Sequence, residues 1–285
     1  MSSGTLYVVA TPIGNLDDIS ARALKILNEV DVIACEDTRH SARLLQHFGI
    51  STKTIACHDH NERNASAGIV ELLQKGQSVA LISDAGTPLI SDPGYVLLRE
   101  VHRAGLTVCP IPGVSALIAA LSVAGIATDR FVFEGFLPSK SAARRERLKQ
   151  LVDETRTLVF YESSHRILAS LDDLIGVFGA EREATMAREI SKKFETIRSA
   201  NLEQLQAFVA GDLNQQKGEF VLVVAGAKPL TDTVNAERIL AILLEELPVK
   251  QAAALAGKLS DSNKNELYQK ALAMRKITSG LSGDE

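Results

Sequence analysis

The chain has 285 residues, of which 46% are hydrophobic and 23% charged, and its formal net charge is −4. This composition is typical of a soluble protein with two domains and a small third one, and it argues against a strongly basic nucleic-acid binder. No apolar run approaches the roughly 20 residues that cross a bilayer, and the N-terminus lacks the basic region of a signal peptide. Three scattered cysteines fit neither a disulfide framework nor a zinc site. We therefore expect a cytoplasmic protein with no membrane span and no bound metal.

The first part of the chain alternates between predicted strands and helices. Strands are expected at 6–10, 31–35, 79–82 and 107–111, each a short apolar run. Helices are expected over 19–28, from residue 41, around 70–73 and over 95–103. This alternation is typical of a parallel sheet with crossover helices and indicates an α/β domain.

A turn-prone loop follows each of these four strands, at 11–15, 36–39, 83–88 and 112–115. Ligands of open α/β sheets bind outside the carboxyl ends of the strands, so these loops predict a binding cleft. In the third loop, Ala85 and Gly86 let a ligand approach the backbone, and Asp84 supplies a carboxylate. Each loop taken alone also fits an ordinary connection from strand to helix.

The second part of the chain begins near residue 119 and clusters its strands more than it alternates them. Strands are expected at 131–133, 157–161, 183–189 and 219–226, which indicates a mixed α+β domain. From about residue 236 the pattern is helical, with short helices separated by turns. This segment fits a helix-turn-helix-like module and equally a packing appendage.

Six motifs carry a resemblance to a known family: Ala10 to Asp18, Cys35 to Arg39, Ser83 to Pro88, Ser91 to Gly94, Pro110 to Ser115 and Phe160 to Arg166. They resemble the class III S-adenosylmethionine methyltransferases, which have the tetrapyrrole methylase fold. The match is closest to the branch that 2′-O-methylates a cytidine of 16S rRNA. It covers roughly residues 5 to 226, and the helical tail resembles an extra C-terminal domain of that branch. The first loop contains less glycine than in the tetrapyrrole enzymes, which argues against a porphyrinoid substrate.

The resemblance implies two α/β domains with parallel and mixed sheets, with S-adenosyl-L-methionine bound in the cleft between them. It also implies a homodimer that acts on 16S rRNA or the 30S ribosomal subunit. The expected domains are 1–117 and 118–230, followed by a helical C-terminal domain at 234–285. By carry-over, the residues expected to line the cofactor are Leu16, Asp84, Ala85, Gly86, Thr87, Pro112, Gly113, Val114, Ser115, Ala116, Tyr161, Met186 and Ala187.

Two charged groups are candidates for acid–base chemistry, because a ribose hydroxyl is a poor nucleophile that a base or a cation would assist. Asp37 and Arg39 follow the second strand, where they fit either catalysis or a surface salt-bridge cluster. Glu162 and His165 follow a strand of the second domain, and the carboxylate is expected to orient the imidazole. A helix start capped by a serine explains the same residues without catalysis.

Basic residues are expected to bind RNA phosphates, although a charge run also fits a solvated helix face. The candidates are Arg144, Arg145, Arg147, Arg188, Lys192 and Lys193.

Two other functions remain open on the sequence. One is a methyltransferase for a small molecule or a protein, of the tetrapyrrole or diphthamide kind. The other is a binding module that retains the cofactor fold without catalysis.

Overall fold

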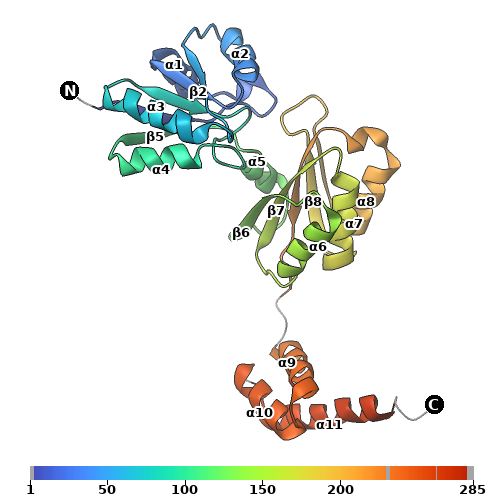
Figure 1. Ribbon diagram of the computed structural model, residues 1–285. Coiled ribbons are helices and arrows are strands. Elements are labelled where there is room, and N and C mark those ends of the chain that lie inside the picture. Colours follow the sequence, from blue (N-terminus) through green and yellow to red (C-terminus); the bar gives the residue numbers. More distant parts are fainter. Residues whose placement is uncertain (1–2, 229–231, 261, 281–285) are drawn as a thin grey trace. The chain divides into compact units, whose positions relative to one another are not determined.

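The computed structural model describes residues 3–228, 232–260 and 262–280, and the chain forms two compact units, Met1–Ala227 and Lys228–Glu285 (Figure 1). The first unit contains two five-stranded sheets. The α/β class and the helical C-terminal region are thereby confirmed. The expected domain boundary near residue 117 lies, in the sequence, between the last strand of the first sheet and the first strand of the second, and both sheets belong to the first unit.

The first sheet is parallel and has the strand order β3-β2-β4-β1-β5. Its strands are β1 (Thr5–Val9), β2 (Val32–Cys35), β3 (Thr54–Ala56), β4 (Val79–Ile82) and β5 (Thr107–Ile111). All residues of β2 and β4 are buried, as expected of strands that helices cover on both faces. The edge strand β3 was not predicted, because three residues give too short an apolar signal.

Helices cover both faces of this sheet (Figure 1). One face packs against α1 (Ala21–Glu29) and α2 (Thr38–His47), and the other against α3 (Glu62–Gln74) and α4 (Tyr95–Arg103). The Ser20 hydroxyl caps α1 by accepting the N–H of Ala23, so this helix begins slightly later than predicted. The short 3-10 helix η1 (Leu16–Asp18) precedes it.

The second sheet is mixed and has the order β6-β7-β10-β8-β9. Its strands are β6 (Phe131–Phe136), β7 (Thr157–Ser163), β8 (Glu183–Arg188), β9 (Thr196–Asn201) and β10 (Glu219–Val224). Only β6 and β7 pair in parallel. The polar edge strand β9 was not predicted, because its sequence lacks an apolar run.

The second sheet is also covered on both faces. Helix α5 (Ala116–Val123) packs on one face against Val159, Ala187 and Val221. The other face packs against α6 (Ser141–Gln150), α7 (Ile167–Phe178) and α8 (Leu202–Gly211), which η2 (Leu213–Gln216) follows. The face that carries α5 is the one that meets the first domain (Figure 1).

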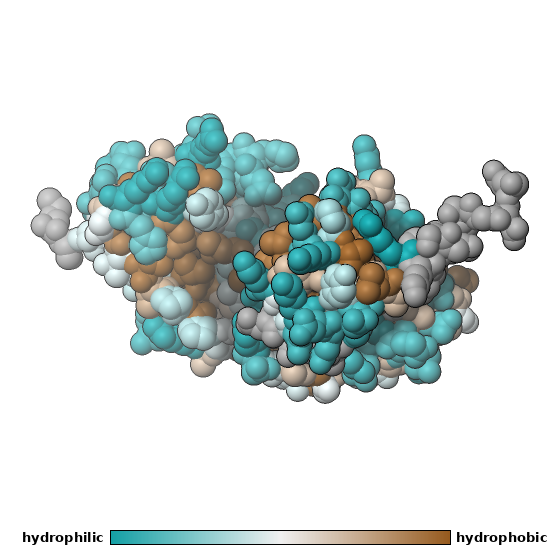
Figure 2. Space-filling view, turned by 90° about the horizontal axis from the view of Figure 1, so that it is seen from below, coloured by the Kyte–Doolittle hydropathy of each residue, from teal (hydrophilic) through white to brown (hydrophobic). Residues whose placement is uncertain are grey.

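The second unit consists of α9 (Asp232–Glu246), α10 (Val249–Leu259) and α11 (Lys264–Gly280). Small residues such as Ala252, Ala253 and Ala256 let these helices approach closely around Leu240. On the face drawn in Figure 2, apolar side chains gather in patches that hydrophilic side chains surround. No helix in the described part of the chain is long and apolar enough to cross a membrane.

Candidate functional site

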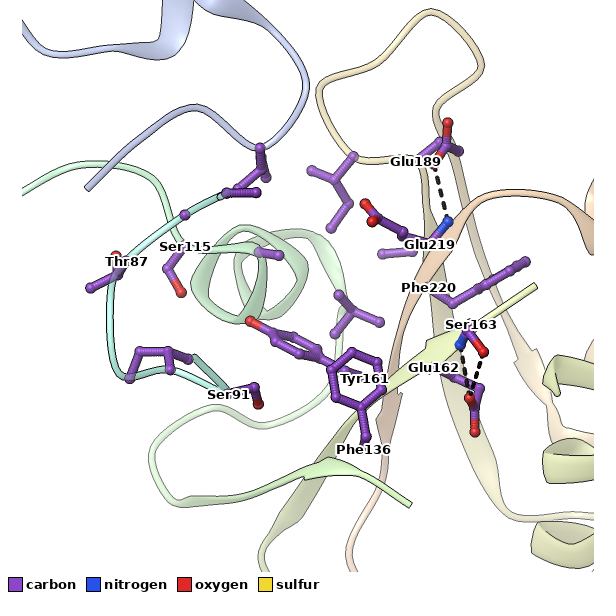
Figure 3. A pocket seen from close by; sticks show the side chains of 18 of the residues that line it. Thr87, Ser91, Ser115, Phe136, Tyr161, Glu162, Ser163, Glu189, Glu219 and Phe220 are labelled. Atoms are coloured by element: carbon purple, nitrogen blue, oxygen red, sulfur yellow. Dashed lines mark hydrogen bonds between the residues drawn. The ribbon is translucent and has the colours of Figure 1, made fainter. Parts of the chain in front are cut away.

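A cavity of about 250 Å³ lies between the two α/β domains (Figure 3). The first domain supplies Ile13 from the loop after β1, the segments Ala85–Thr87 and Ile90–Asp92 from the loop after β4, and the start of α5. The second domain supplies residues from β6, β7, β8 and β10 and from the loop after β8. The carboxyl ends of the parallel strands therefore form one wall, as the loop pattern predicted.

The loops of the first domain are joined by backbone hydrogen bonds. Thr11 and Gly86 exchange two of them, with N···O distances of 2.8 and 3.0 Å. The Thr87 hydroxyl donates to the carbonyl of Val114 at 2.9 Å, which ties in the loop after β5. Gly86 has φ +84°, a conformation that glycine adopts without steric cost. These bonds hold the wall of the cavity in one arrangement.

Seven of the residues expected to line a cofactor lie in the wall of the cavity: Ala85, Gly86, Thr87, Ser115, Ala116, Tyr161 and Ala187. Pro112, Gly113 and Val114 lie in the loop behind this wall, where a Cβ on Gly113 would come within 2.8 Å of the Cβ of Ala10. Leu16 lies in η1, outside the wall. Asp84 is directed to the neighbouring loop, where its Oδ1 accepts the N–H of Asp37 at 3.2 Å.

Met186 was expected to line the cofactor, but its side chain does not reach the cavity. Met186 is fully buried in the core beneath α6, α7 and α8, whereas Ala187 faces α5 and the cavity. Successive side chains of a strand point to opposite faces of the sheet, so only one of the two neighbours can line the cleft.

Two aromatic rings form the part of the wall that β6 and β7 supply (Figure 3). The ring centroids of Tyr161 and Phe136 lie 5.6 Å apart, and the Tyr161 hydroxyl accepts the N–H of Leu117 at 3.1 Å. Burial raises the pKa of Tyr161, so it remains a neutral hydroxyl. Phe136 is 54% exposed and lines the cavity. No role was predicted for it, because the expected strand ended at residue 133, three residues short of the observed end of β6.

Carboxylates outnumber cations in the cavity wall. Among the described residues, the wall contains Asp92, Glu162, Glu189 and Glu219 but only one cation, Lys192. The Lys192 ammonium lies 2.8 Å from an oxygen of Glu189 and 2.8 Å from one of Glu219. Burial opposes the charge on Lys192, but these bonds outweigh it and raise its pKa. Lys192 is therefore engaged with carboxylates in the cavity wall, where it neutralises part of their charge.

The loop after β8 also reaches the first domain. Glu189 and Ser191 have positive φ angles of 52° and 68°, which are uncommon for residues with a side chain. The Ser191 hydroxyl donates to the carboxylate of Asp18 across the cleft. This loop, residues 189–195, bridges the two domains at the edge of the cavity.

Asp37 and Arg39 form a surface ion pair, the alternative that the sequence left open. Asp37 caps α2 by accepting the N–H of Arg39 at 2.8 Å, and its Oδ2 lies 2.9 Å from Nη2 of Arg39. The Arg39 hydrogen bonds lower the pKa of Asp37. The Arg39 side chain is 89% exposed, and neither residue lines the cavity.

The expected pairing of Glu162 with His165 is wrong. Glu162 is 1% exposed, and its carboxylate accepts the Ser163 N–H at 2.7 Å and the Ser170 hydroxyl at 2.6 Å. It also lies 2.8 Å from the Arg166 guanidinium. His165 is exposed and outside the cavity wall. The partners of the carboxylate are Arg166, Ser163 and Ser170 rather than the imidazole, so Glu162 fixes the start of α7.

Two of the arginines expected to bind RNA are buried, which corrects that prediction. Arg144 is 2% exposed and lies 2.7 Å from Asp173, with further bonds to three backbone carbonyls. Arg188 is 6% exposed and donates to the carbonyls of Lys217 and Phe194. Guanidinium groups with these partners are not available to phosphates.

Of the other expected RNA-binding residues, Lys192 is held by Glu189 and Glu219 in the cavity wall, and the remaining three are accessible. Arg145 is half exposed beside Asp173, and Arg147 pairs with Glu134. Lys193 is exposed, and its ammonium lies over the Phe194 ring. Lys193 thus stands beside the cavity with its charge open to solvent.

Asp92 is a cavity residue with a perturbed pKa that sequence reasoning missed, although it lies inside one of the matched motifs. Burial raises its pKa to about 6, with smaller contributions from Glu36, Asp84 and Asp59 and an opposing one from the Ser83 hydroxyl. In the described residues, no group of three or more His, Cys, Asp or Glu side chains is arranged to hold a metal ion.

Two family models match the chain. Tetrapyrrole (Corrin/Porphyrin) Methylases match residues 5–206, and the RsmI C-terminal HTH domain matches residues 231–275.

Curated relatives match along almost the whole length. The chain is 59% identical to Ribosomal RNA small subunit methyltransferase I of Pseudomonas aeruginosa, over 95% of this chain and 98% of the relative. It is 53% identical to the protein of the same name from Escherichia coli O157:H7, over 95% and 96% of the two chains.

Solved structures show the same fold at low identity. The methyltransferase CobJ aligns with a TM-score of 0.59 and 18% identity, over 80% of this chain and 98% of that chain. Diphthine synthase aligns with a TM-score of 0.57 and 16% identity, over 78% and 90%. Such likenesses establish the fold alone.

Proposed function

Because the chain belongs to the ribosomal RNA small subunit methyltransferase I family, within the tetrapyrrole methylases, we propose that its cleft methylates the 2′-oxygen of a cytidine ribose in 16S rRNA. The chain is a methyltransferase that uses S-adenosyl-L-methionine as its methyl donor. The observation that carries the site assignment is the acidic cavity between the two domains, at the carboxyl ends of the parallel strands.

The residues of the cavity fit this donor. S-adenosyl-L-methionine carries positive charge on its sulfonium and its ammonium. The wall offers Asp92, and Glu189 and Glu219 share the single Lys192, while Glu162 is bound by Arg166. The small residues Ala85, Gly86, Ser115, Ala116 and Ala187 leave space along the wall, where they would hold the nucleoside of the donor. When bound, the donor supplies a methyl group that its sulfonium already activates.

The chain's main contribution to the reaction is alignment of the two reactants. Holding an attacking oxygen in line with the methyl group can supply about 7–11 kcal/mol of the barrier without a special catalytic group. The interlocked loops around Thr11, Gly86 and Thr87 provide a fixed wall of this kind. Exposed cations outside the cavity, such as Lys193 and Arg145, would bind the phosphates of an RNA that the acidic wall itself would repel.

We further propose that the protein is a cytoplasmic homodimer and that its substrate is the 16S rRNA within the 30S subunit. Two apolar side chains of α5, Ile118 and Val123, are more than half exposed. Exposed apolar patches mark interaction surfaces, which supports self-association. Sedimentation of the purified chain tests the dimer, and a monomer at micromolar concentration would contradict it.

The function is tested with radiolabelled donor and unmodified substrate. The wild-type chain is incubated with free 16S rRNA and, separately, with 30S particles from cells that lack this activity. Nucleosides are then separated, and we expect label in 2′-O-methylcytidine, with the particles as the better substrate. Label only on bases, or label only on an added tetrapyrrole or protein substrate, would overturn the assignment. Equilibrium dialysis with the donor distinguishes an enzyme from a module that binds no donor.

A further inference from the structure

A general base for the ribose hydroxyl must lie in the cavity wall and must be free to accept a proton. Asp37 does not meet this requirement because it is paired with Arg39 outside the wall, and Glu162 does not because its carboxylate is already bound by Arg166, Ser163 and Ser170. Resting on the function proposed above, we propose that Asp92 is the general base that accepts the proton of the 2′-hydroxyl.

The loop that carries Asp92 is held in an unusual conformation. Leu89 and Ser91 have φ angles of 72° and 66°, and such angles are energetically unfavourable for residues with side chains. A loop stays in this conformation only where its surroundings enforce it, and this type of strain gathers at active sites.

The buried carboxylate of Glu62 holds the end of this loop in place. Glu62 is 8% exposed, and its Oε1 accepts the N–H groups of Gly94, Val96 and Leu97 at 3.0, 2.8 and 3.2 Å. These donors belong to the residue before α4 and to its first turn, where the helix dipole also favours a negative charge. Asp92 lies two residues before Gly94, so the position of its backbone is fixed from inside the protein.

The same loop meets the second domain. A Cβ on Gly135 of β6 would lie 3.1 Å from the Ser91 hydroxyl, and β6 has its register shift between Phe133 and Gly135. Asp92 and Tyr161 both line the cavity, and the charge of Asp92 is one of the causes that raise the pKa of Tyr161, after burial. Asp92 therefore lines the cavity from the first domain, whereas the Glu189–Lys192–Glu219 cluster lines it from the second.

The groups around Asp92 make it a stronger base than an ordinary aspartate. The carboxylates of Glu36, Asp84 and Asp59, in neighbouring loops of the first domain, act on it through their charge, the Tyr161 hydroxyl of β7 interacts with its charge in turn, and the Ser83 hydroxyl at the end of β4 opposes the effect of the carboxylates. Burial and these negative charges raise its pKa to about 6. At pH 7 to 8 it is ionised, yet its affinity for a proton is far above that of a solvent-exposed carboxylate.

The step balances without a further reactant. Asp92 takes the hydroxyl proton as the ribose oxygen forms its bond to the methyl carbon. The carbon–sulfur bond of the donor breaks, and its electron pair stays on sulfur, which leaves a neutral thioether. The proton later leaves Asp92 for solvent through the open side of the cleft.

The test compares Asp92→Asn with the wild type in three measurements. Carbon-13 NMR of labelled aspartate in the ligand-free protein should show one carboxyl with a pKa of about 6, and the variant should lack this signal. Calorimetry should show donor affinity within threefold of the wild type. Single-turnover methyl transfer should fall by about 10²-fold or more, and the acidic limb of the rate profile should disappear.

Two further variants serve as controls. Glu36→Gln removes a neighbouring charge and should move both the NMR titration and the acidic limb to lower pH, an effect that a purely structural Asp92 would not transmit. Asp129→Asn removes an exposed acid outside the cavity and should behave like the wild type.

Three outcomes would overturn the proposal. They are an Asp92→Asn rate within threefold of the wild type, an unchanged acidic limb, and a loss of donor affinity large enough to explain the rate. A wild-type chain that methylates no RNA would instead refute the proposed function, while the NMR titration would still report the state of Asp92.

Discussion

Lys192 of the second α/β domain packs directly on Gly14 of the first, so closely that a Cβ on Gly14 would lie 2.2 Å from the Cγ of Lys192. The contact joins the loop after β1 to the bridging loop 189–195. Because the obstructing atom is in the middle of the lysine side chain, any side chain at position 14 must displace Lys192 from Glu189 and Glu219.

We expect Gly14→Ala to fold normally and to slow methyl transfer by about tenfold to 10²-fold, since small misplacements in an active site cost that much. Gly68→Ala in α3, where a Cβ meets nothing within 4 Å, is the matched control. In a Lys192→Ala background the Gly14 substitution should cost less than in the wild type, because only the unfavourable backbone angle of φ +158° remains, and a double-mutant cycle on the rate will reveal the difference. Full additivity would contradict the steric explanation.

Arg144→Ala should destabilise the protein by about 3–5 kcal/mol, because it leaves the buried carboxylate of Asp173 without its main partner. Arg145→Ala removes a half-exposed neighbour of the same carboxylate and should cost about 1 kcal/mol or less. Urea denaturation followed by circular dichroism measures both. Equal losses of stability in the two variants would show that the buried arginine contributes no more than the half-exposed one.

Lys193→Ala should weaken binding to 16S rRNA and reduce the slope of log affinity against log salt by about 1, the effect of one lost phosphate contact. Lys25→Ala in α1 serves as the control for loss of an exposed charge. Filter binding at several salt concentrations gives both slopes. A slope unchanged by Lys193→Ala would remove this residue from the RNA-binding surface.

Asp92→Asn should stabilise the fold at neutral pH. The pKa of this carboxyl is about 6 in the folded chain against 3.8 for an ordinary aspartate, so protonation favours folding and the ionised group destabilises it. The variant should therefore gain about 1–2 kcal/mol at pH 8, a figure reduced for partial exposure, and nothing below about pH 4. Thermal melts at both values measure it. If the gain in stability were the same at pH 4 and pH 8, it would not come from the titration of the Asp92 carboxyl.

The strand and loop pattern predicted the first sheet well, because buried parallel strands are continuous apolar runs and their ends carry small and polar residues. The short strand β3 and the polar strand β9 lack that signal. Seven of the thirteen expected cofactor residues line the cavity, and they lie mainly in the loops that gave the clearest motifs.

Side-chain direction and burial were harder to predict. The resemblance pointed to both Met186 and Ala187, but the choice between two neighbours depends on which face of the strand meets α5. The burial of Arg144 depends on Asp173, which is 29 residues away in another helix. Asp92 was passed over because the desolvation that raises its pKa exists only once the loops have assembled.

The position of β10 has a consequence for the order in which the chain folds during synthesis. The first sheet is complete once Ile111 has left the ribosome, whereas β10 is the last strand made in the second sheet and lies at its centre. Until Val224 emerges, β7 and β8 expose unpaired edges, which are prone to pair wrongly. The nascent protein therefore has its first domain before it has a cleft, and it gains the ability to hold a methyl donor only when almost all of the first unit has been translated.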